Sequence, residues 1–84
     1  MSPRYSYFLD YAIFIYSNEG DEPIHVHVAK TGSPQNNSKF WVRSDSIEIA
    51  HNQARIPAHR IKKIETYLAL NAEHIIAFWK SHFE

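Results

Sequence analysis

The sequence predicts an α+β domain: a four-stranded, mostly antiparallel sheet with one or two C-terminal helices packed on one face. Four short runs rich in β-branched and aromatic residues occupy the first part of the chain, between Tyr11 and Ala50. From Pro57 onward the apolar spacing changes from every second residue to steps of three and four. Strands followed by helices, rather than alternating with them, are typical of the α+β class.

The composition is that of one small folded domain, residues 1–84. Hydrophobic residues make up 44% of the chain and aromatic residues 14%, which favours a compact core over disorder. Nine Lys and Arg balance nine Asp and Glu, so a general phosphate-backbone binder is disfavoured. The absence of cysteine excludes disulfides and thiolate metal ligands. With no signal-like or membrane-length apolar run, we expect a cytoplasmic protein without membrane contact.

The first two predicted strands flank a turn. Residues 1–10 are expected to be an N-terminal tail that docks through its tyrosines, and Tyr11–Tyr16 to be the first strand. Ser17 to Pro23 has turn composition, and Pro23 forces the residue before it to be extended. The second strand, Ile24–Ala29, then pairs with the first in antiparallel fashion.

The second strand carries the most distinctive pattern of the chain, two histidines alternating with β-branched residues. Side chains alternate across a strand, so Ile24, Val26 and Val28 share one face. His25 and His27 stand roughly 7 Å apart on the other. The aliphatic face is expected to be core and the histidine face a candidate site.

The remaining elements are a hairpin and a helical segment. Lys39–Val42 and Ile47–Ala50 are predicted to be the third and fourth strands, and Pro57–Phe83 to be helical with at most one break. Asn71 is the expected break, where it would cap a second helix. The apolar helical stripe consists of Ile61, Ile64, Leu68, Ile75 and Trp79, extended by Phe78 and Phe83.

Three segments resemble a known family: Ser17 to Val28, Lys39-Phe-Trp41, and Ile75 to Phe83. The family is the small bacterial one called domain of unknown function 4160, and the similarity covers nearly the whole chain from Phe8. In that family an Asn-rich turn leads to a Pro-x-His-x-His-Val strand, and a Trp lies near the end of the last helix. Those positions are occupied here by Pro23, His25, His27, Val28 and Trp79. The chain departs from the pattern at Ile24, often a second proline, and at Gly20 and Asp21, often an Asp-His pair.

The resemblance implies an architecture more than an activity. Members of the family are often encoded beside another small domain of unknown function, which implies a toxin–antitoxin-like module of two genes. We therefore expect a protein partner encoded by the adjacent gene. The oligomeric state stays open.

Two imidazoles on one strand face form a minimal metal-ligand set when a carboxylate joins them. Glu19, Asp21 and Glu22 lie just upstream as candidate third ligands, and Glu19 with His25 and His27 is the set we favour. No obligatory cofactor is expected, although this donor set would accept a divalent metal. The alternative is that both histidines only hydrogen-bond on the sheet.

Paired histidines can also act without metal, one as base and one as acid on a ribose 2′-hydroxyl and its leaving oxygen. His25 and His27 would then be catalytic residues of a small endoribonuclease, with RNA as partner. Lys30, Lys39 and Arg43 would hold phosphate beside them if the third strand lies alongside.

The other aromatic and imidazole residues divide into core and surface. Trp41 faces opposite to Phe40 and Val42, so it is expected to be partly exposed and to mark a binding surface together with Glu22. Trp79 is expected in the core. His51 would join the His25/His27 face if its strand lies alongside, whereas His59, His74 and His82 are expected on the helix surface.

Taken together, the sequence favours a protein-binding half of a two-gene system. A small endoribonuclease toxin is the alternative.

Overall fold

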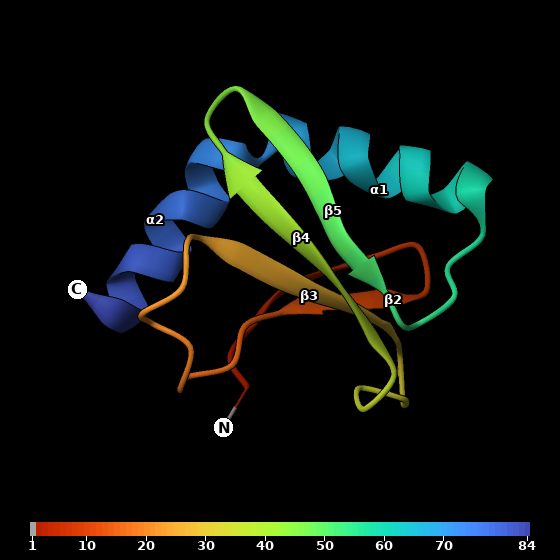
Figure 1. Cartoon of the computed structure of the whole chain (residues 1–84), viewed down its shortest axis with the longest axis horizontal. Helices are drawn as coiled ribbons and strands as arrows, with labels where there is room; N and C mark the ends of the chain where they lie inside the picture. Colours follow the sequence, from red (N-terminus) through yellow and green to blue (C-terminus); the bar gives the residue numbers. More distant parts are fainter. Residues whose placement is uncertain (1) are drawn as a thin grey trace.

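The computed structural model describes residues 2–84 and contains one five-stranded sheet and two helices (Figure 1). The strands are β1 (Arg4–Phe8), β2 (Tyr11–Phe14), β3 (His25–Lys30), β4 (Asn37–Arg43) and β5 (Ser46–Asn52). All neighbouring pairs are antiparallel, and the strand order in the sheet equals the order in the chain. The α+β class is confirmed, but the predicted count of four strands is wrong.

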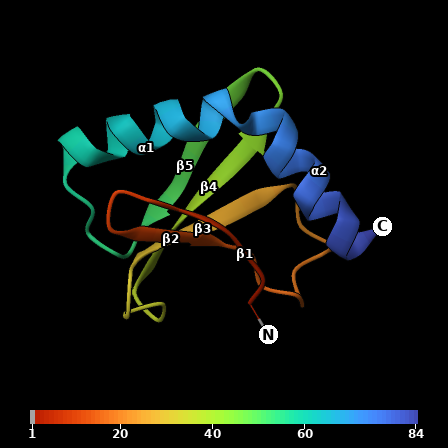
Figure 2. The ribbon, with the colours of Figure 1, turned by 180° about the vertical axis from the view of Figure 1, so that it is seen from behind.

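The fifth strand comes from residues expected to be a tail. β1 forms a hairpin with β2 through the turn at Leu9 and Asp10, and it lies at the edge of the sheet (Figure 2). Tyr5 docks as expected, with its ring 5.4 Å from that of Phe78, whereas Tyr7 points outward and is exposed. The strand was missed because its apolar and polar residues alternate only weakly.

The helical segment is two helices, α1 (Ala58–Leu70) and α2 (Ala72–Phe83), lying along one face of the sheet (Figures 1 and 2). The break falls at Asn71, as predicted. Its side chain, however, does not cap α2: its amide donates to the Tyr67 carbonyl oxygen of the preceding helix. Asn71 therefore precedes α2 through its backbone, whose carbonyl oxygen accepts from the Ile75 N–H at 2.9 Å, while its side chain bonds to the end of α1.

The core lies between the helices and the inner face of the sheet. Its sheet side is built on alternation, because Val26 and Val28 of β3 and Phe40 and Val42 of β4 all point toward the helices. On the helical side the predicted residues Ile64, Leu68, Ile75 and Trp79 are buried, together with Ala72, which was not predicted. The other members of the predicted stripe, Ile61, Phe78 and Phe83, pack against this core but are only partly buried. The opposite, outer face of β3 is therefore left to His25 and His27.

Candidate metal centre

The two histidines of β3 lie on the outer face of the sheet, as the alternation predicts. His25 is opposite Trp41 on β4, and His27 is opposite Lys39. The rings are closer than expected from strand geometry, with centroids 5.1 Å apart, because both imidazoles lean toward the same point.

This face is covered by the loop between β2 and β3, residues 15–24. At one end of the loop the Tyr16 ring lies 4.5 Å from the His27 ring. In the middle, Gly20 lies so close to α2 that a Cβ atom there would be 2.5 Å from the Phe83 ring. As a result His25 is completely buried and His27 is only 4% exposed. Both histidines of the candidate site are therefore shielded from solvent.

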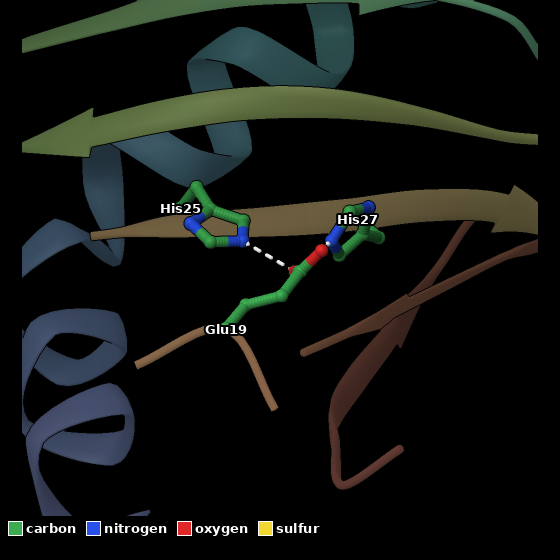
Figure 3. Close-up of side chains that lie close together, drawn as sticks. All are labelled: Glu19, His25 and His27. Carbon is green, nitrogen blue, oxygen red and sulfur yellow. Dashed lines mark hydrogen bonds and ion pairs between the residues drawn. The ribbon is translucent and has the colours of Figure 1, made fainter. Parts of the chain in front are cut away.

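Glu19 reaches from this loop to a point between the two imidazoles (Figure 3). Its Oε1 lies 2.8 Å from Nε2 of His25 and 2.8 Å from Nε2 of His27. One ligand atom from each residue can be chosen so that all three lie within 4.8 Å of one another. We call these three residues the histidine–glutamate cluster.

The hydrogen-bond partner of each Nδ1 atom, on the side of the imidazole away from Glu19, shows which ring nitrogen carries the proton. His25 Nδ1 is 2.7 Å from the carbonyl oxygen of Pro23, which can only accept, so this nitrogen carries a hydrogen and donates it. His27 Nδ1 is 2.8 Å from Oδ1 of Asn37. The Asn37 amide nitrogen donates to the Pro34 carbonyl oxygen, so its Oδ1 is the acceptor. Both imidazoles are therefore protonated at Nδ1.

With both Nδ1 atoms donating, a neutral imidazole turns the lone pair of its Nε2 toward Glu19. Two nitrogen lone pairs would then point at one carboxylate oxygen at hydrogen-bond distance, and this arrangement is repulsive unless positive charge lies between the nitrogens and the oxygen. That positive charge can come from two further protons, one on each Nε2, or from one cation. Histidines that bind metals commonly donate their other N–H to a carbonyl oxygen, which is the arrangement at Pro23.

In the first of these two cases, with both imidazoles protonated at Nε2, Glu19 stays ionised. Partial burial alone would raise its pKa, but hydrogen bonds from His25 and His27 and their charges outweigh burial and hold the pKa below its usual value. The carboxylate therefore presents negative charge to the cluster at neutral pH.

The other predicted site residues are divided between two places. Glu22 forms an ion pair with Lys39, and the Lys39 ammonium lies 4.5 Å from the centre of the Trp41 ring. Trp41 is half-buried and borders the cluster, since its ring is 5.6 Å from that of His25. Arg43 instead pairs with Glu48 at the exposed end of β4, away from the cluster, and Asp21 is exposed.

His51 joins this face through a bulge in β5. Lys39 is paired with His51 and Phe40 with Ile49, so Ala50 is an extra residue that reverses the alternation. Without the bulge His51 would point inward with Ile47 and Ile49. The remaining histidines, His59, His74 and His82, are exposed, as predicted.

Replacement of His51 by glutamine is expected to flatten the acid side of the stability profile. Burial lowers the pKa of His51 below its ordinary 6.5, and the charges of His27 and Lys39 act in the same direction. Below that pH the unfolded chain binds a proton that the folded chain resists, so the free energy of unfolding falls as pH drops. Urea unfolding from about pH 6.5 to pH 5, with chelator present, measures the slope. Parallel curves for parent and variant would contradict the assignment, and His74→Gln is the matched control.

Sequence reasoning missed Asn37 and Tyr16, the two residues that orient His27. Asn37 binds His27 Nδ1 and donates to the Tyr16 hydroxyl at 3.2 Å. It lies at the end of a polar loop rich in Asn and Ser, where nothing separates it from its neighbours. Only the β3–β4 register, which pairs Asn37 with Ala29, brings it to the histidines.

Fold and cluster together define a small α+β domain with a closed His-His-Glu centre on the outer face of its sheet. The chain belongs to the family described as Domain of unknown function (DUF4160), whose family model matches residues 11–80. Comparisons with curated proteins and with solved structures found no match. Within residues 2–84, neither helix is long and apolar enough to cross a membrane.

Proposed function

We propose that the protein is a partner-binding module stabilised by a divalent cation in the histidine–glutamate cluster. One observation supports a bound cation. The Nδ1 atoms of His25 and His27 both donate hydrogen bonds, to Pro23 and Asn37, so their Nε2 atoms are left to face Glu19 as possible ligands. Imidazole ligands suit zinc and its transition-metal neighbours rather than magnesium or calcium.

The cation would tie the loop of residues 15–24 to β3. Tetrahedral zinc, bonded at about 2.0–2.1 Å, separates its ligands by roughly 3.3 Å. The two 2.8 Å contacts of Glu19 Oε1 would therefore lengthen by about half an ångström, and the two Nε2 atoms would also have to lie about 3.3 Å from each other. One ligand from the loop and two from the strand make loop order depend on the cation.

Titration calorimetry with zinc tests this proposal. We expect one cation per chain, with affinity reduced at least about tenfold in Glu19→Gln, since loss of one ligand removes both a bond and the negative charge. His82→Gln is the control, because His82 is exposed and outside the cluster. Unchanged affinity in Glu19→Gln would disprove the site.

The partner is proposed to be the product of an adjacent gene in a two-gene module. A closed cluster supports this function because it shapes and rigidifies the outer face without needing access to solvent. Co-expression of both gene products, followed by purification through a tag on this chain, tests the association. Absence of a complex would remove the partner-binding function.

The endoribonuclease alternative ranks second. General acid–base catalysis requires imidazole nitrogens within hydrogen-bond reach of the substrate. The burial of His25 and His27 weighs against it, as does the engagement of all four of their nitrogens. Lys39, the phosphate-binding candidate, is already paired with Glu22, and Arg43 with Glu48. RNA cleavage would require the loop of residues 15–24 to open first.

A further inference from the structure

The most exposed large hydrophobic side chains of residues 2–84 all border the edge strand β1. They are Tyr7 (53% exposed), Leu9 (51%) and Leu70 (81%). Tyr7 lies on β1 itself and Leu9 in the turn that follows it. Leu70, at the end of α1, lines a groove with Phe8 and Tyr67, whose stacked rings are 4.3 Å apart. Tyr7 and Leu70 line different hollows, one on each side of β1, so this edge strand carries exposed apolar surface on both sides, which is a feature of interaction sites.

Leu9 is unfavourable in two respects at its position. Its φ angle is 55°, in the left-handed region where Gly or Asn is favoured and a residue such as Leu is strained. Its side chain is also half in solvent. The two-residue turn between β1 and β2 accounts for the positive φ, but it does not require an exposed apolar side chain there, and that side chain is what an interaction surface would explain.

β1 also has a free backbone edge. It is the first strand in the sheet order and pairs only with β2, so its other side has no strand neighbour among the described residues. Free edges of this kind accept an additional strand from another chain, with alternate side chains entering pockets on either side. Here the groove of Phe8, Tyr67 and Leu70 lies on one side and Tyr7 on the other.

The charge around this edge is positive. Lys62 and Lys63 line the groove, and neither forms an ion pair with another residue in the described range 2–84. Arg4, on β1, has its guanidinium 4.7 Å from the centre of the Tyr7 ring. A second copy of the chain would bring the same cations toward one another, which disfavours self-association at this edge.

We propose that the edge of β1 binds an extended segment of a partner protein, rich in both acidic and apolar side chains, by strand addition. The proposal rests on the partner-binding function and names the surface and the chemistry that would carry it. Acidic side chains of the segment meet Lys62 and Lys63, and apolar ones fill the groove beside Leu70.

A synthetic peptide of alternating Glu and Val, eight residues long and blocked at both ends, is the probe. Amide NMR of the full chain is expected to show changes along Arg4–Phe8 and at Leu70, with a dissociation constant below about 1 mM. The same peptide with Lys in place of Glu is expected to bind at least about tenfold more weakly. No binding at 1 mM, equal affinity for both peptides, or changes centred on β5 would overturn the proposal.

Variants separate this surface from the rest of the molecule. Lys62→Glu with Lys63→Glu, and Leu9→Asn separately, are expected to weaken peptide binding at least about fivefold. Leu9→Asn should melt no lower than the parent, because Asn tolerates the left-handed region. Glu48→Gln, on the opposite edge strand β5, is the control and should bind as the parent does.

Two further outcomes distinguish this proposal from the function on which it rests. If the complex with the adjacent gene product forms equally well in all these variants, the β1 surface is wrong and partner binding stands. If a concentration-dependent dimer appears by sedimentation and Leu70→Ser abolishes it, the occupant is a second copy, which overturns the proposed partner. Zinc binding, measured independently, should be unchanged in every β1 variant.

Discussion

Replacement of Trp79 by alanine is expected to lower the free energy of unfolding by about 3–5 kcal/mol. Trp79 is buried in the core at the end of α2, with its ring 4.5 Å from that of Phe83. Domains have total stabilities of about 5–15 kcal/mol, and a chain of this size lies toward the low end. Thermal unfolding should therefore shift down by more than about 12 °C or lose its cooperative transition.

Trp79→Phe is the informative comparison. The indole Nε1 is buried, and no hydrogen-bond partner for it exists among residues 2–84. Phenylalanine keeps most of the ring contacts and removes that unpaired N–H, so its cost should be well below that of alanine. Leu70→Ala, at an exposed position, should change little. If Trp79→Ala melts within a few degrees of the parent, the packing of α2 described above is wrong.

Zinc is expected to raise the melting temperature by about 10 °C or more at pH 7.5. A cation at a hundredfold excess over its dissociation constant stabilises the folded state by about 2.7 kcal/mol. In a domain of this length each kcal/mol corresponds to roughly 4–8 °C. Scanning calorimetry with and without zinc measures the increment, and magnesium is expected to give none because the donor set is mostly imidazole.

The zinc increment should disappear near pH 5, because protons compete with the cation for His25 and His27. It should fall by half or more in Glu19→Gln and in His27→Gln, and persist in His82→Gln. An increment that stays at its full size in both cluster variants would place the cation elsewhere. If zinc has no effect on the parent at either pH, the positive charge beside Glu19 comes from protons, and the cluster is a hydrogen-bonded clamp.

The parts of the fold that follow from side-chain periodicity were predictable from sequence. The alternation in β3 gave the correct inner and outer faces, and the change of period after Pro57 gave the helices. β1 escaped because its alternation is weak and because Leu9 occupies a turn position where Gly or Asn is the usual signal. The bulge at Ala50 likewise has no recognisable sequence signal. Whether His51 points outward could therefore be decided only from the register between β4 and β5.

The candidate site was predictable in its strand residues and ambiguous in its loop residues. Glu19, Asp21 and Glu22 were all candidate third ligands, and although Glu19 was favoured, sequence distance alone did not separate it from the other two. Tertiary contacts separate them: Gly20 against Phe83 sets the course of the loop, Glu19 turns toward the histidines, and Glu22 pairs with Lys39. The loop that supplies Glu19 also buries the cluster, which no local pattern could indicate.

The order of strands in the sheet has a consequence for how the chain folds. Every strand pairs with its neighbour in sequence, so the sheet can form by adding one hairpin after another. Each step then closes only a short loop and loses little chain entropy. β1 is the exception on its inner side, where Ser6 bonds to Tyr67 and Tyr5 to Asn71, residues 61 and 66 positions away. Those contacts form only after the helices have docked, so β1 should be the last strand to become protected from hydrogen exchange and the first to lose protection.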